Sequence, residues 1–172
     1  MDYLKEIKQF HAEQVEPYIG KPVGCSQEEI AEFEKKIGYP LPEAYCQFLK
    51  WMGKDYRGVF IGCNWFITDV INNTEWLPQF LAKNNIDFKL PEHYLVFFSY
   101  RGYIAAWFEL PKENDNPTAY FFTESKELTI PSIGEKFTDV LFKDMRDLAY
   151  FLPEIHKKKC TFFCSCKRLS DF

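Results

Sequence analysis

Residues 156–172 hold the closest group of side chains that could bind a metal ion. His156, Cys160 and Cys164 follow one another at four-residue steps, and Cys166 comes two residues later. On a helix these steps would bring the imidazole and two thiols near one another, and zinc accepts such ligands. Structural zinc sites usually pair two close cysteines with a second, distant pair, which this segment lacks. We therefore favour a basic, flexible tail with reduced thiols, and we predict no metal or other cofactor.

His93, beside Glu92 and just before a predicted strand, is the next candidate for a reactive group. A catalytic base needs a nucleophile within hydrogen-bond reach, and no Ser or Cys stands at a spacing that points to one. A triad is recognised in space, so this alternative stays open at the level of sequence. Gly-rich phosphate-binding motifs do not occur. We predict no enzyme; a small hydrolase built on His93, or a zinc-dependent enzyme built on the tail, is the least favoured alternative.

Several predicted loops combine aromatic and charged side chains of the types that dominate protein interfaces. A loop aromatic can also lie over the edge of the core, so both interpretations stay open. An acidic run on a predicted helix adds carboxylates that would steer a partner, although a solvated helix face is the ordinary interpretation. The candidate partner-binding residues are Asp55, Tyr56, Arg57, Trp65, Tyr100, Arg101, Glu28 and Glu32.

Residues 26–53 are predicted to form two short helices joined by a proline turn. Ser26 and Glu29 have the spacing of a capping box, Gly38 fits a left-handed helix end, and Pro42 suits the first position of the next helix. The inner face of the first helix is expected to comprise Ile30, Phe33 and Ile37. The inner face of the second is expected to comprise Ala44, Tyr45, Phe48, Leu49 and Met52.

This stretch also carries a family pattern: a charged helix with a central Glu, a hydrophobic residue and Gly, Leu-Pro, an aromatic, Phe-Leu and a closing Gly. The matching residues are Ile30, Glu34, Ile37, Gly38, Leu41, Pro42, Tyr45, Phe48, Leu49 and Gly53. With Leu90-Pro91 and Phe137-Thr138 further on, the pattern resembles the SUKH superfamily (Smi/Knr type) over residues 26–152. One departure is Met52-Gly53-Lys54, where the family usually has Asn-Gly-Gly.

The resemblance implies an α+β domain with an antiparallel sheet. Most bacterial members of that family resemble immunity proteins, which bind and neutralise a cognate toxin that is often a nuclease. Fungal relatives are regulators of cell-wall synthesis. The resemblance therefore implies a non-enzymatic protein that binds a cognate toxin, with a regulatory or scaffold role of the fungal kind as the alternative.

Length and composition indicate one globular domain. The chain has 172 residues, of which 47% are hydrophobic and 19% aromatic, and this aromatic content favours a sheet packed on helices. No apolar run is long enough for a membrane span, and the first 16 residues contain acids and no continuous apolar core, unlike a signal peptide. We expect a cytoplasmic protein with reduced cysteines.

The net charge of −4 is unevenly distributed. Residues 156–172 hold five of the 21 Lys and Arg and one of the 25 Asp and Glu, so residues 1–155 carry a net charge of about −8. An acidic body disfavours direct contact with nucleic acid and suits a basic protein partner, such as a nuclease toxin. The alternative is that mild acidity only keeps the protein soluble.

The remaining pattern predicts a single α+β domain at 1–155, with four to six antiparallel strands packed against helices, and a tail at 156–172. One helix is expected over 2–16 and a loop over 17–25. A helix over 69–86 is expected to have Pro78 in an early turn, capped by Asn73 or Thr74. Strands are expected at 59–62, 94–98, 103–110, 119–123 and 128–131, and a final helix at 137–152, with Pro153 at its end.

Overall fold

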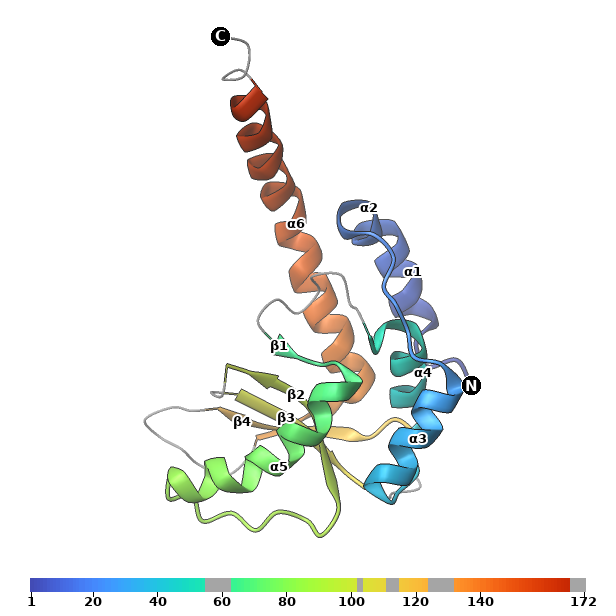
Figure 1. Cartoon of the computed structure of the whole chain (residues 1–172), viewed down its shortest axis with the longest axis vertical. Helices are drawn as coiled ribbons and strands as arrows, with labels where there is room; N and C mark the ends of the chain where they lie inside the picture. The colour runs from blue at the N-terminus through green and yellow to red at the C-terminus, as the bar shows by residue number, and fades with distance from the viewer. Residues whose placement is uncertain (55–62, 102–103, 111–114, 124–131, 168–172) are drawn as a thin grey trace.

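The structure is a computed structural model that describes residues 1–54, 63–101, 104–110, 115–123 and 132–167, apart from the side chains of 63–64, 123, 132–134 and 155–167. The elements in chain order are α1 (Lys5–Gln14), α2 (Glu16–Ile19), α3 (Gln27–Ile37), α4 (Glu43–Met52), β1 (Cys63–Asn64), α5 (Ile67–Lys83), β2 (Tyr94–Tyr100), β3 (Ile104–Glu109), β4 (Thr118–Thr123), β5 (Ser132–Lys136) and α6 (Phe137–Lys167). Figure 1 shows α5 across the sheet, α1 to α4 grouped beside it, and α6 running away from it.

The described strands form one five-stranded sheet in the order β1-β2-β3-β4-β5, and every neighbouring pair is antiparallel. Strand order therefore follows chain order. The α+β fold class with an antiparallel sheet is confirmed. The strands expected at 59–62 and 128–131 lie outside the described residues.

Both faces of the sheet are buried, as the alternation along β3 illustrates. Ala106 and Phe108 point into a core shared with α1, α3, α4 and α6, whereas Ala105 and Trp107 point into a second core under α5. The first core also takes Leu95 and Phe97 from β2, and the second takes Val96. Successive side chains of a strand face opposite ways, so adjacent residues enter different cores.

The helical corner of α3 and α4 forms largely as its sequence predicts. Ser26 and Glu29 make both hydrogen bonds of the capping box, and Gly38 ends α3 with φ of 82°, in the left-handed region. Pro42 stands one position earlier than expected, as the residue before the first turn of α4. A Glu34 carboxylate oxygen accepts the Leu41 amide at 2.7 Å and so joins α3 to the turn that follows it.

The expected start of the next helix is wrong. α5 begins at Ile67, Pro78 lies inside it, and Thr74 is an interior residue rather than a cap. Proline removes the backbone donor that would bond the carbonyl four residues earlier, here Thr74. The Tyr94 hydroxyl donates to that carbonyl at 3.2 Å, so a side chain from β2 replaces the missing amide.

Two other boundaries differ from expectation. The predicted loop at 17–25 starts inside α2, where Pro17 occupies the first turn and its missing amide has no helix partner to lose. The last helix does not stop at Pro153, because α6 continues to Lys167. A helix can accommodate a proline at the cost of one backbone hydrogen bond. The division of the chain at residue 155 stays a prediction.

Candidate functional site

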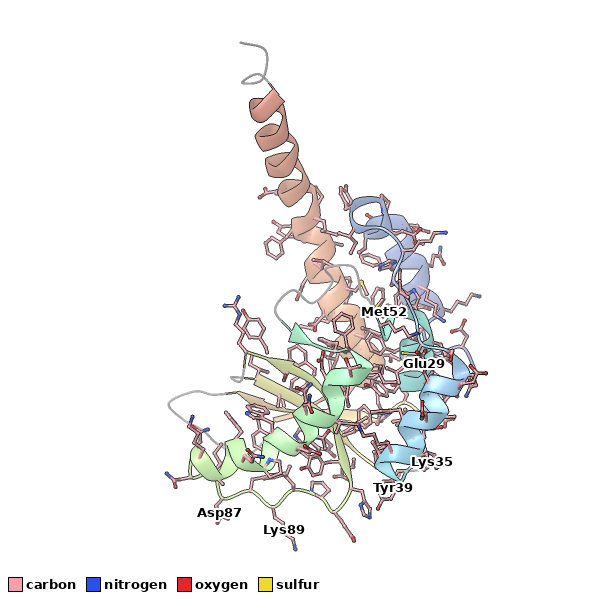
Figure 2. All side chains as sticks on the ribbon, viewed as in Figure 1. Glu29, Lys35, Tyr39, Met52, Asp87 and Lys89 are labelled. Atoms are coloured by element: carbon pink, nitrogen blue, oxygen red, sulfur yellow. The ribbon has the colours of Figure 1, made fainter. Side chains whose placement is uncertain are left out.

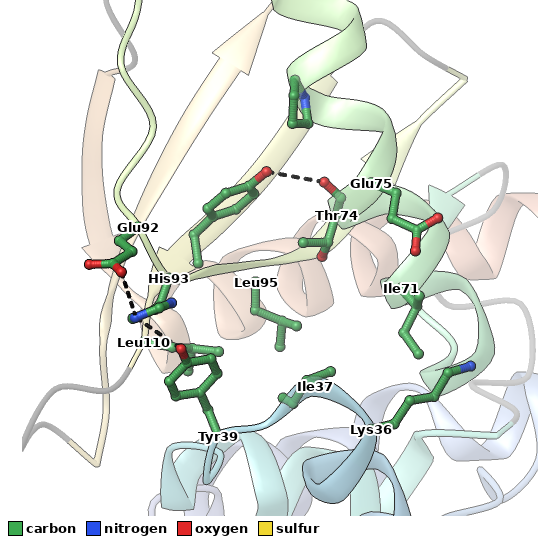
Figure 3. Close-up of a pocket in the computed structure, with 12 residues that line it drawn as sticks. Lys36, Ile37, Tyr39, Ile71, Thr74, Glu75, Glu92, His93, Leu95 and Leu110 are labelled. Carbon is green, nitrogen blue, oxygen red and sulfur yellow. Dashed lines mark hydrogen bonds and ion pairs between the residues drawn. The ribbon is translucent and has the colours of Figure 1, made fainter.

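A pocket of about 390 Å³ opens where the end of α3, the middle of α5 and the start of β2 meet (Figure 3). Its size is within the range of small-ligand and side-chain pockets. It is lined by Lys36, Ile37, Tyr39, Ile71, Thr74, Glu75, Pro78, Glu92, His93, Tyr94, Leu95 and Leu110.

The floor of the pocket is apolar. Leu95 and Leu110 are buried core residues, and Ile37 and Ile71 are half-buried at the edge of the same core. Ile37 packs against the core, as predicted, but it is half-buried rather than fully buried like Ile30, and its side chain also lines the pocket.

One wall of the pocket is a contact between two distant segments. The Tyr39 hydroxyl and His93 Nε2 lie 2.9 Å apart, and their ring centroids are 4.2 Å apart. Glu92 Oε1 lies 3.7 Å from the same nitrogen, and the His93 carbonyl accepts the Leu110 amide. Figure 2 shows Tyr39 at the end of α3, beside the segment that leads to β2. His93 thus holds the turn after α3 against the start of β2.

The opposite wall belongs to α5, and its Thr74 hydroxyl is engaged within the fold. The Thr74 hydroxyl donates to the Val70 carbonyl at 2.8 Å and accepts the Val96 amide at 3.0 Å. Val96 lies beside the shift in register between β2 and β3, where the pairing of the two strands is irregular. Its amide donates to the side chain of Thr74 on α5. The described lining of the pocket contains no Ser or Cys, and its threonine is bonded in this way. The hydroxyl within hydrogen-bond reach of His93 is that of Tyr39.

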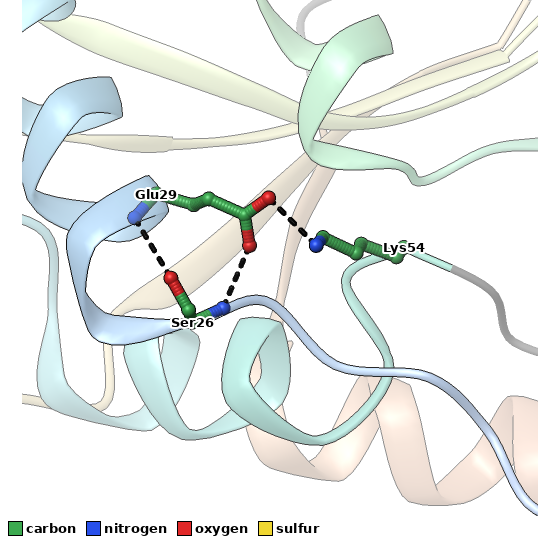
Figure 4. A network of polar contacts seen from close by, with 3 residues as sticks. All are labelled: Ser26, Glu29 and Lys54. Carbon is green, nitrogen blue, oxygen red and sulfur yellow. Dashed lines mark hydrogen bonds and ion pairs between the residues drawn. The ribbon is translucent and has the colours of Figure 1, made fainter.

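A shallow groove adjoins the pocket along α3 and α5. The two share Lys36 and Ile71, and the groove is further lined by Glu29, Glu32, Phe33, Lys35, Ile67 and Thr68. Glu29 is already engaged, because its carboxylate accepts the Ser26 amide at 2.8 Å and pairs with Lys54 at 2.6 Å (Figure 4). The hydrogen bond from Lys54 is the main cause that lowers the pKa of Glu29.

The five partner residues predicted from the sequence that the structure describes do not gather at one place. Glu28 and Glu32 are exposed on α3, and Glu32 lines the groove. Tyr100 and Arg101 lie at the far end of β2, with the guanidinium carbon 5.4 Å from the ring centroid. A seven-residue strand spans about 20 Å, so this pair is remote from the pocket. Asp55, Tyr56 and Arg57 lie outside the described residues.

The prediction that Trp65 is a partner-binding residue is corrected by its burial. Its side chain is 1% exposed, and its ring centroid lies between 5.2 and 5.5 Å from those of Phe48, Phe97 and Phe98. The residue follows a strand of only two residues, and the chain turns there into α5, which places the indole in the core. Trp65 therefore cannot serve as a surface anchor in this structure.

The metal hypothesis concerns side chains that the structure does not describe. The backbone of α6 is helical through Cys160, Cys164 and Cys166, but their side chains and that of His156 lie outside the described set. Among the described residues, no group of three or more His, Cys, Asp or Glu is placed to hold a metal ion. The described buried cysteines are Cys25 and Cys46, and burial raises the pKa of each thiol to about 11. In that state they are poor nucleophiles.

Sequence reasoning singled out His93 and Ile37 but not the pocket that they share. The lining comes from α3, α5, β2 and the end of β3, which are separated by up to 74 residues between Lys36 and Leu110. The local sequence signals are the mixed polar and apolar residues at the end of α3 and the His before β2. Neither signal indicates which distant segment it will contact.

No helix in the described part of the chain is long and apolar enough to cross a membrane.

Comparison with known proteins places this chain in a described family. A family model described as the SMI1/KNR4 family (SUKH-1) matches residues 24–143, which include the α3–α4 corner, the pocket and the first turns of α6. A search of curated proteins returns no match to this chain.

Proposed function

This chain belongs to the SMI1/KNR4 family (SUKH-1), and from that membership we propose that it is a non-enzymatic immunity protein that neutralises a cognate toxin by direct binding. The family supports protein binding of the immunity or cell-wall-related kind. The proposal places the protein in the cytoplasm, where it would cover a basic toxin, such as a nuclease, before that toxin reaches its substrate.

The observation that carries the proposal is the pocket and its adjoining groove. Together they provide an indented, partly apolar surface whose described lining contains no Ser or Cys. Such a surface is suited to hold side chains of another protein. Residues 1–155 add a net charge of about −8, which would attract a basic partner and raise the rate of association.

The mechanism would be stoichiometric occlusion. Two tertiary hydrogen bonds hold the walls of the pocket in place: the Val96 amide donates to the Thr74 hydroxyl, and Tyr39 bonds His93. The Leu41 amide, which donates to Glu34, fixes the turn between α3 and α4. A preformed surface loses little conformational freedom when a partner binds, so more of the contact energy is available for affinity. The protein would block access to the toxin's active site and would transform nothing.

The test is co-expression with the product of each adjacent gene. We expect one neighbour to be toxic alone, to be neutralised by this chain, and to form a 1:1 complex that survives gel filtration. A chain carrying Leu49→Asp, which places a charge in the core, should give no protection.

If no neighbouring product is toxic or binds, the immunity proposal is wrong. A cell-wall-related regulatory role would then be the family-level alternative, and its signature would be a stable complex with a non-toxic partner.

A further inference from the structure

We propose that the pocket between α3, α5 and β2 receives an arginine side chain of the protein partner. This inference rests on the proposed function, since it specifies the chemistry by which that surface would recognise a basic protein. It names the anchor residue type, the groups that hold it and the point on this chain where the contact is centred.

The floor of the pocket fits the aliphatic part of such a side chain. Ile37, Ile71, Leu95 and Leu110 present apolar groups at the base, beneath a polar rim. Long cationic side chains bury their methylene stems on apolar surface while the charged end stays among polar groups. A purely apolar anchor would make no use of the carboxylates at the rim.

The rim supplies the counter-charges. Glu75 lies on α5 and Glu92 lies on the opposite side, just before β2, and both side chains are exposed (Figure 3). Among the described lining residues Lys36 supplies the ammonium, and it lies across the pocket from Glu92 (Figure 3). The described lining thus has two carboxylates against one ammonium, with His93 Nε2 3.7 Å from Glu92, and this balance favours a cation over an anion as the occupant.

Aromatic rings favour arginine over lysine. Tyr39, His93 and Tyr94 all line the pocket, and the first two form one wall with ring centroids 4.2 Å apart. A guanidinium is planar, stacks on aromatic faces and can donate two parallel hydrogen bonds to a carboxylate, whereas an ammonium is a compact, strongly hydrated charge. Arginine is also among the residues that most often dominate the binding energy of interfaces.

The first experiment probes the pocket without the partner. N-acetyl-arginine amide is titrated into ¹⁵N-labelled protein, with N-acetyl-lysine amide and N-acetyl-glutamate amide as comparisons. We expect saturable shifts of the amides of Tyr39, Tyr94 and Leu95 with the arginine compound, at least threefold weaker binding of the lysine compound, and no saturation with the glutamate compound. Absence of arginine-dependent shifts at these amides would overturn the inference.

The second experiment uses the toxin complex. The double variant Glu75→Gln/Glu92→Gln should weaken toxin binding at least tenfold, and Ile71→Trp, which fills the pocket, should do the same. The control Glu6→Gln/Glu13→Gln removes the same charge from exposed positions of α1 and should change Kd less than twofold. Circular dichroism melting confirms that each variant is folded.

The outcomes separate the two proposals. If the toxin binds parent, double variant and Ile71→Trp alike, the arginine inference is wrong and the immunity function stands. If no neighbouring product binds, the immunity function fails, and the arginine titration still decides whether the pocket has the stated chemistry. If the α1 control loses as much affinity for the toxin as the Glu75→Gln/Glu92→Gln variant, the inference is also contradicted. The loss would then follow from the change in net charge and not from the pocket.

Discussion

At the scale of single residues, Tyr94 shows how a side chain can correct a defect in a distant helix. Pro78 has no backbone N–H to donate to the Thr74 carbonyl within α5. The Tyr94 hydroxyl donates to that carbonyl instead, at 3.2 Å. A half-buried carbonyl without a partner costs more than an average hydrogen bond contributes. The phenol therefore ties β2 to α5 at the wall of the pocket.

Replacing Tyr94 by Phe should lower the free energy of unfolding by about 1 kcal/mol, since the Thr74 carbonyl loses its donor. In a Pro78→Ala background the amide of residue 78 can bond that carbonyl, so the same replacement should cost markedly less. A double-mutant cycle measured by urea denaturation provides the check. Equal costs of Tyr94→Phe in both backgrounds would show that this hydrogen bond does not compensate for the proline.

His11 is a buried ionisable side chain with a predictable response to pH. It is 1% exposed, its ring meets the edge of Trp51 at a centroid distance of 5.1 Å, and its Nε2 has no hydrogen-bond partner among the described residues. Burial lowers the pKa of His11. The unfolded chain therefore binds a proton more readily than the folded protein as the pH falls below about 6.5.

Stability should consequently decrease between pH 6.5 and the lowered pKa, and each unit of lowering contributes about 1.4 kcal/mol at most. His11→Phe, which keeps a ring at this position, should reduce the loss of stability between pH 7 and pH 5. Urea midpoints at pH 7, 6 and 5 for both proteins measure the difference. Parallel pH profiles would mean that His11 does not titrate with folding.

At the scale of elements, Glu34 connects α3 to the turn before α4. Replacing it by Ala leaves the Leu41 amide without its acceptor and should lower the free energy of unfolding by about 1–3 kcal/mol. Glu34→Gln retains an acceptor oxygen and should cost less. The control is Glu32→Ala on the exposed side of the same helix, for which we expect a change within about 0.5 kcal/mol. Similar urea midpoints for the Glu34→Ala and Glu32→Ala variants would contradict this role of Glu34.

The elements that could be predicted from the sequence are those whose signals are local. Ser26, Glu29 and Gly38 lie within the segment that they cap, so the ends of α3 follow from chemistry a few residues wide. The interior position of Pro78 could not be predicted in the same way, because its compensating group comes from Tyr94 on another element. The length of α6 was missed since Pro153 resembles a stop signal when it is considered alone.

The candidate site was harder to predict than the fold. Tyr39 and His93 are 54 residues apart, and only the packing of α3 against the start of β2 brings their polar atoms to 2.9 Å. Residue type makes Trp65 a candidate for an interface or for the edge of the core, and its surroundings of Phe48, Phe97 and Phe98 place it in the core. Residue types suggest interface chemistry, whereas tertiary structure decides which of those residues are accessible.

At the scale of the whole molecule, α6 joins the folded body to an extension of opposite charge. The described buried side chains of this helix are Phe137, Val140, Leu141, Met145 and Leu152. Beyond them the helix leads away from the sheet (Figure 1) and carries Lys157, Lys158 and Lys159. The molecule is thus acidic over its body and basic at one end.

A chain that stops after Ile155 should retain its fold, with a free energy of unfolding within about 1 kcal/mol of the parent, because the described core residues of α6 are all kept. Its net charge would change from −4 to about −8. Association with a basic partner should then become faster, and more so at low ionic strength. Thermal melting and stopped-flow binding at two salt concentrations test both points; a large loss of stability would show that residues 156–172 belong to the folded domain.

The meander order of the strands has a consequence for synthesis on the ribosome. Each strand pairs with the one made just before it, so the sheet can assemble progressively as the nascent chain emerges. The first helix must wait much longer, because Phe10 of α1 meets Phe142 of α6, with ring centroids 5.4 Å apart. Until that late segment leaves the exit tunnel, this side of the sheet lacks the part of its cover that α6 provides, and a stalled chain would be an early target for chaperones.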